Sequence, residues 1–248
     1  MNDPVRTSPP PASIEDVLAR LRAIDAALPP DDGVACFNRM YLRVTENVAA
    51  RIGESYFADD AYVARMDVVF AGYYLGAVDA EAAFAAGTVP AEVPRCWAPL
   101  FEARSDARIA PIAFALAGMN AHINHDLART VLDLAEERGV GPTRGSAEHA
   151  DFLRINAVLG ATIESVKAEL GPRFRGSAIG EVDAAIGRAD DAVALFSVAH
   201  AREAAWTGGE TLWALRSFPG AAEAYDASID RLVGMASRAM LSAARVGA

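Results

Sequence analysis

Alanine-rich segments with helical spacing of their apolar residues, each closed by glycine or proline, constrain the fold of this chain more than any other feature. Alternating runs of β-branched residues, which would indicate strands, are absent. The chain is therefore predicted to be all-α, a single helical bundle of seven to eight helices. The predicted helices cover residues 14–28, 37–52, 59–86, 111–138, 146–170, 180–216 and 219–245.

Local signals set several of these helix ends. Ser13 and Asp16 have capping-box spacing, and Asp59 or Asp60 can cap the third helix. Gly139 is typical of a helix C-terminus. The pair Gly171-Pro172 is expected to end a helix, and Gly208-Gly209 is expected to break one.

Length and charge narrow the classes of protein that are compatible with the chain. Its 248 residues suit a disordered tail over residues 1–12 and one helical domain over 13–248. The net charge of −10 argues against non-specific binding to nucleic acid. The apolar runs Val68–Val78 and Ile109–Met119 are too short or too interrupted to predict a membrane span. We expect a cytoplasmic protein, with Cys36 and Cys96 as buried free thiols and with the oligomeric state open.

One polar segment interrupts the apolar sequence. Residues 118–127, GMNAHINHDL, hold two asparagines, two histidines and an aspartate between apolar flanks. Burying so many polar groups costs free energy unless each finds a partner. The segment therefore predicts either a working site or a buried polar network.

The spacing within this segment favours metal binding. His122 and Asp126 are four residues apart, so on an α-helix they share a face and could hold one divalent ion such as Zn, Mn, Fe or Mg. Asn120 and Asn124 form a second pair, turned by about 160°, and His125 lies between the two faces. The polar side chains of other helices that could complete a site are Glu46, Asp67, Glu203 and His200. Asp67 stands out among them because it interrupts an apolar helix face, where a lone carboxylate is costly.

A structural network explains the same residues about equally well. In that interpretation Asn120 and Asn124 bridge helices, and His122 bonds Asp126. Asp67 would then pair with an arginine such as Arg39 or Arg43. Polar clusters of this kind also arise for purely structural reasons.

The polar segment also carries a resemblance. Together with FNRMYLRVT at 37–45, RMDVVFAGYY at 65–74 and AREAAW at 201–206, it resembles an uncharacterised bacterial family, a domain of unknown function with a signature close to GMNAHINxDL. The resemblance extends from about Phe37 to the last helix. It implies an all-helical domain but no activity. The signature positions are Asn120, His122, Asn124 and Asp126, while His125 stands at a variable position.

HxxxD on a helix is also similar to part of the metal site of zinc-dependent phospholipase C and P1-type nucleases. This chain departs from them because it has four histidines and no second HxxxD or HxxxE. One or two ions are therefore the most that it is expected to hold.

Three hypotheses for function follow. The first is metal-assisted hydrolysis of a small molecule, with His122 and Asp126 as ligands, Asp67 or Glu46 as third ligand or general base, and Asn120 or Asn124 binding substrate. The second is a cyclase or isomerase acting on an apolar, isoprenoid-like substrate, suggested by the aromatic residues of 70–74. The third is a non-catalytic binding module in which the polar segment is a structural clamp.

Overall fold

The computed structural model describes residues 9–87, 93–174 and 198–245. The helices in this part of the chain are α1 (Ile14–Ala27), α2 (Gly33–Ala49), α3 (Asp60–Ala85), α4 (Ala98–Ala103), α5 (Pro111–Ala121), the π-helix η1 (His122–Asp126), α6 (Leu127–Arg138), α7 (Ala147–Phe174), α9 (Val198–Leu215) and α10 (Ala221–Ala243). The described residues contain no strand, and α5, η1 and α6 follow one another without a break. Counted as one helix, these three bring the total to eight, which confirms the predicted all-α bundle. The expected tail at 1–12 lies mostly outside the described residues, and the single domain stays a prediction.

Several of the predicted helix ends are confirmed. Ser13 and Asp16 form both hydrogen bonds of a capping box at the start of α1. The Asp59 side chain accepts a hydrogen bond from the backbone N–H of Tyr62 and so caps α3. Gly139 ends α6 with a φ of 68°, a left-handed conformation that glycine adopts without strain.

Other predicted ends are wrong for identifiable reasons. α2 begins at Gly33 rather than Phe37, because the Asp32 side chain caps it by accepting from the N–H groups of Val34 and Ala35. α2 also ends at Ala49, before the expected end at 52. α7 continues through the Gly171-Pro172 pair to Phe174, so this pair lies in the last turn and not beyond it.

The predicted break at Gly208-Gly209 is also wrong, because α9 is continuous there. These glycines serve packing against α6. A Cβ atom on Gly208 would lie 2.9 Å from Cβ of Ala128, and one on Gly209 would collide with Val131. Lacking a side chain at both positions, α9 approaches the helix that carries the polar segment.

The long helix predicted over 111–138 is present but contains the π-helical turn η1. Its wider turn is closed by a hydrogen bond from the N–H of Leu127 to the carbonyl of His122. The turn coincides with the polar residues of the signature segment. Single π turns inside α-helices occur frequently at functional sites.

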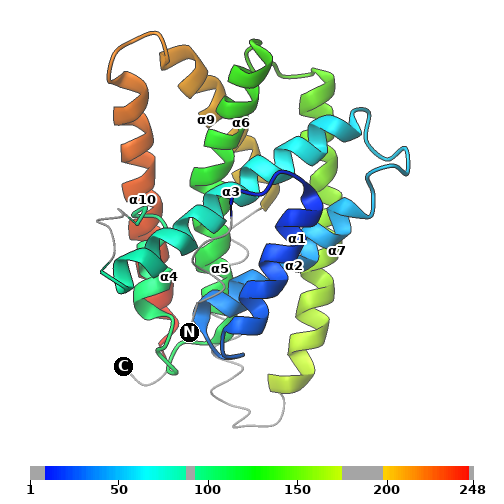
Figure 1. Cartoon of the computed structure of the whole chain (residues 1–248). Helices are drawn as coiled ribbons and strands as arrows, with labels where there is room; N and C mark the ends of the chain where they lie inside the picture. The colour runs from blue at the N-terminus through cyan, green and yellow to red at the C-terminus, as the bar shows by residue number, and fades with distance from the viewer. Residues whose placement is uncertain (1–8, 88–92, 175–197, 246–248) are drawn as a thin grey trace.

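This central helix runs through the middle of the bundle, between α10 and α7 in the view of Figure 1. It packs against α2, α3, α9 and α10. At Gly118 the Phe37 ring of α2 lies against the helix backbone, where any Cβ atom would collide with it. The polar segment is therefore enclosed on several sides.

α3 is long and apolar enough, by length and composition, to cross a membrane, and it is the only described helix of which this is true. The sequence prediction considered only its middle part. In the bundle α3 packs against α1, α6 and α7, and 33 % of its most apolar window is buried. One helix of this kind does not establish a membrane span.

Candidate metal centre and cleft

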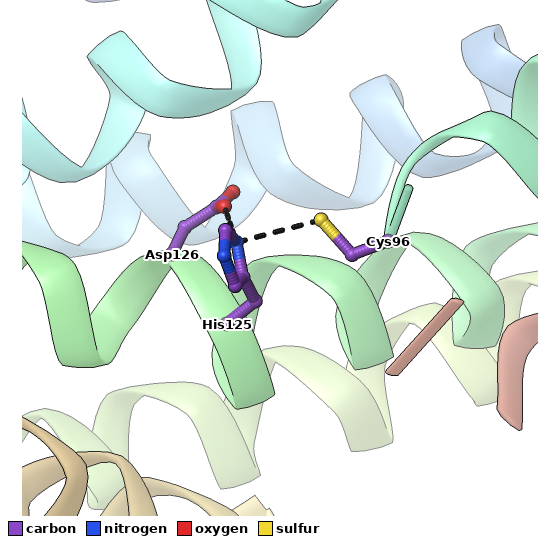
Figure 2. A group of neighbouring side chains, drawn as sticks. All are labelled: Cys96, His125 and Asp126. Atoms are coloured by element: carbon purple, nitrogen blue, oxygen red, sulfur yellow. Dashed lines mark hydrogen bonds and ion pairs between the residues drawn. The ribbon is translucent and has the colours of Figure 1, made fainter. Parts of the chain in front are cut away.

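Three side chains of ligand type meet at the π-helical turn. His125 and Asp126 come from η1, and Cys96 comes from the segment that precedes α4 (Figure 2). Nδ1 of His125 lies 2.9 Å from Oδ1 of Asp126 and 3.4 Å from Sγ of Cys96. All three residues are buried, and one ligand atom from each lies within 4.8 Å of the others. This group could hold a metal ion.

A second layer of side chains orients the three. Oδ2 of Asp126 accepts hydrogen bonds from Nε1 of Trp97 and Nδ1 of His122, each at 3.0 Å. On the far side of the His125 ring, Nε2 lies 3.4 Å from Oδ1 of Asp226. Metal-binding histidines commonly direct their second nitrogen to a carboxylate in this way.

The main chain at Cys96 is tied to α10. The Asp230 carboxylate accepts hydrogen bonds from the N–H groups of Arg95 (3.2 Å) and Cys96 (2.8 Å). Gly234, one turn further along α10, has the carbonyl of Arg95 directly above it, where any Cβ atom would collide. The loop can therefore lie close to α10 because Asp230 accepts its N–H groups and Gly234, four residues later on the same face, has no side chain.

Burial and hydrogen bonding shift the pKa values in opposite directions. Burial disfavours the charged form of His125, but the carboxylates of Asp126 and Asp226 outweigh this and raise its pKa to about 9. Burial would raise the pKa of Asp126, but hydrogen bonds from both histidines hold it below its usual value. Burial lowers the pKa of His122 and raises that of Cys96 well above the ordinary value. The carboxylates on both sides of the His125 ring thus favour its protonated form, while burial favours the thiol form of Cys96.

The predicted ligand pair is only partly brought to this centre. Asp126 belongs to it. His122 instead lies behind Asp126, with its ring stacked on Phe70 at a centroid distance of 3.5 Å and its Nε2 atom without a hydrogen-bond partner. The group that meets at Asp126 instead includes His125 and Cys96, whose Nδ1 and Sγ atoms lie 3.4 Å apart.

The two asparagines bridge helices. Nδ2 of Asn120 donates to the carbonyl of Val233 (3.1 Å) and to the Ser237 hydroxyl (2.9 Å), both on α10. Nδ2 of Asn124 donates to Oδ1 of Asn120 at 2.8 Å. Asn120 thus has the helix-bridging contacts of the structural hypothesis, while Asn124 is the less buried of the two.

The carboxylates predicted as third ligand or general base lie elsewhere. Glu46 pairs with Arg22 at 2.7 Å, and both side chains are largely exposed. Asp67 is buried beside a small cavity of about 40 Å³, and its Oδ2 has no hydrogen-bond partner. Arg39, its suggested partner, pairs with Asp25 at 3.0 Å. Burial raises the pKa of Asp67 to about 7.

Sequence reasoning missed Cys96, Asp226 and the importance of His125. A lone cysteine far from the segment gives no spacing signal, and Asp226 is one of many acidic residues on a surface helix. The sequence signal that could have pointed to His125 is its position directly before Asp126. In the π-helical turn these two neighbouring side chains lie within 2.9 Å of each other.

A cleft of about 360 Å³ lies between the central helix, α9 and α10. His125 and Asp226 line it, together with Asn120 and Asn124. Its volume is in the range of pockets that hold small molecules. His125 therefore belongs both to the candidate metal centre and to the wall of a cleft.

Comparison with known proteins places the chain in a family. The model of a family of unknown function, DUF5995, matches residues 14–243. The chain belongs to DUF5995. This match confirms the resemblance noted in the sequence and spans the candidate metal centre and the cleft of this DUF5995 member. The comparisons found no matching curated protein and no matching solved structure.

Proposed function

We propose that this DUF5995 protein is a metal-dependent hydrolase of small molecules. The observation that carries the proposal is the buried group of Cys96, His125 and Asp126, with His125 shared between it and the cleft. Three protein ligands with room for a fourth are typical of catalytic zinc sites, whereas structural sites have four. The ligand set differs from the sequence hypothesis in that His125 and Cys96 replace His122.

The donor atoms fit a zinc-like ion. A thiolate, an imidazole nitrogen and a carboxylate oxygen suit zinc or iron better than magnesium, which prefers oxygen ligands alone. The second layer also fits, since Asp226 can accept the Nε2–H of His125 when Nδ1 binds the ion. Likewise Trp97 and His122 fix Oδ2 of Asp126 and leave Oδ1 facing the centre.

A bound ion would supply a polarising centre and would lower the pKa of a coordinated water. The side chains have separate tasks around it. With an ion on Nδ1, Asp226 would fix the tautomer and orientation of His125 from 3.4 Å, and Arg129 lies 3.2 Å from Asp226 in turn. Asn124, at the edge of the cleft, can accept or donate a hydrogen bond and so position a substrate.

Elemental analysis of the purified, tag-free protein by plasma mass spectrometry tests the proposal. We expect near-stoichiometric zinc or iron, lost in Cys96→Ser and His125→Gln. Cys36→Ser is the matched control because Cys36 is a free thiol that is not part of this group, and it should retain the metal. Metal-free wild-type protein that also fails to bind added zinc would refute the proposal.

The structural clamp is a second candidate with an observation of its own. The side-chain amide of Asn120 donates both of its hydrogen bonds to α10. The Asp126 carboxylate is already hydrogen-bonded to both histidines. In that case Asn120→Ala and Asp126→Asn would lower stability, and no variant would lose an activity at unchanged stability.

The cyclase alternative needs a large apolar cavity. The cavity beside Phe70 measures about 40 Å³, well below the usual size of ligand pockets. The cleft of about 360 Å³ beside the polar segment also has apolar walls, so metal content and not cavity size separates the two enzymes.

A further inference from the structure

The walls of the cleft differ in polarity from one helix to another. The central helix contributes polar side chains, Asn120, Asn124 and His125, whereas α9 and α10 contribute mostly small or apolar ones. The apolar walls include Ala204, Gly208 and Leu212 of α9 and Ile229, Leu232 and Ala236 of α10. A ligand that fills such a cleft combines a polar group with an apolar body.

The charges that line the cleft are already paired. Among the described residues of its wall, Asp226 is the only carboxylate, and its Oδ1 lies 3.4 Å from Nε2 of His125. Each has a further partner, Asp126 for His125 and Arg129 for Asp226. A charged ligand would therefore find no unpaired counterion and would lose its hydration.

Asn124 offers hydrogen bonds on the polar wall of the cleft, opposite the α10 wall that includes Tyr225. Its Nδ2 donates to Asn120, which is itself held by α10. Its carbonyl oxygen has no hydrogen-bond partner among the residues that the structure describes. A fixed carbonyl acceptor beside a spare N–H matches a group that both donates and accepts, as a carboxamide does and an ester does not.

The apolar wall continues to the surface along α10. Leu232 lines the cleft although it is 60 % exposed, and Met235, three residues later on α10, is 69 % exposed. Large apolar side chains exposed next to a cleft are typical of binding surfaces. They extend the apolar wall beyond the cleft itself.

We propose that the cleft binds an uncharged amide of an apolar acid, with the amide on Asn124 and the chain between α9 and α10. This binding proposal is argued from the cleft residues alone and does not require a bound metal. Its use as a substrate site rests on the proposed function. In that reaction water adds to the carbonyl carbon, the departing nitrogen takes a proton from that water as the C–N bond breaks, and the products are a carboxylic acid and ammonia or an amine.

Calorimetric titration of the full-length protein with three probes tests the inference. Hexanamide has the amide and the chain, hexanoate has the chain with a charge, and acetamide has the amide without the chain. We expect hexanamide to bind at least about tenfold more tightly than either of the others. Equal binding of hexanoate, or no binding of hexanamide, would overturn the proposal.

Two alanines of α10 provide a matched pair of variants. Ala236 lines the cleft, so Ala236→Phe should fill it and weaken hexanamide binding by at least about tenfold. Ala227 is exposed on the same helix and does not line the cleft, so Ala227→Phe should bind as the wild type does. Loss of binding in both variants, or in neither, would contradict the assigned site.

The two proposals can fail separately. Hexanamide binding by a protein that holds no metal and fails to bind added zinc would leave the amide site standing and refute the hydrolase. Bound metal without preference for hexanamide would leave the metal centre standing and refute the amide site. Plasma mass spectrometry on the titrated sample distinguishes these results.

Discussion

Asp226 on α10 lies 3.4 Å from Nε2 of His125, the ring nitrogen opposite the one that faces Cys96 and Asp126. The imidazole is therefore held between two carboxylates on different helices. This arrangement couples the position of α10 to the geometry of the candidate metal centre.

Asp226→Asn should weaken metal binding by about 10–100-fold, because the amide holds the His125 tautomer less firmly than a carboxylate does. The fold should survive, since the Asp226 side chain is partly exposed. Competition with a chromogenic zinc chelator would measure the affinity. Glu223→Gln, an exposed change on the same helix, is the control and should leave the affinity unaltered. An unchanged affinity in Asp226→Asn would remove Asp226 from the centre.

Gly234→Ala should displace the Cys96 loop, because the new Cβ atom would meet the carbonyl of Arg95. We expect a loss of about 1–3 kcal/mol in the free energy of unfolding and weaker metal binding. Urea denaturation and metal analysis of one preparation would measure both. Gly76→Ala, in open space on α3, should instead stabilise the protein by about 0.5–1 kcal/mol.

Asn120→Ala should lower the free energy of unfolding by about 2–4 kcal/mol, since it leaves Val233 and Ser237 without a donor in a buried place. Ser237→Ala should cost less, because the amide keeps its bond to the Val233 carbonyl. Urea denaturation of both single variants and the double variant would give the coupling energy. Independent, additive effects would mean that the two side chains do not act as one bridge.

The fold was largely predictable because helix ends depend on local chemistry. Ser13, Asp59 and Gly139 act within a few residues of their own positions. The predicted break at Gly208-Gly209 was wrong because these glycines allow close packing against a neighbouring helix, which no local sequence pattern reveals.

The candidate site was predictable only in part. The polar segment contains the turn and the aspartate of the candidate centre, but α-helical geometry was assumed, and η1 brings His125 to that centre in place of His122. Cys96 and Asp226 lie 30 residues before and 100 after Asp126 in sequence and join the same group of side chains only through the tertiary fold. Such long-range contacts leave no spacing pattern.

The last prediction concerns pH and Asp67. Its pKa is raised by burial from 3.8 to about 7, so between these pH values the folded protein holds a proton that the unfolded chain has lost. Stability must then fall as pH rises through this window, by up to about 1.4 kcal/mol per pH unit, and level off above pH 7. Asp67→Asn removes the ionisation while keeping the shape. Its free energy of unfolding, relative to wild type, should increase by about 2–3 kcal/mol from pH 5 to pH 8 in urea denaturation. A constant difference between Asp67→Asn and wild type across this range would mean that Asp67 is ionised, and therefore partnered, in the folded protein.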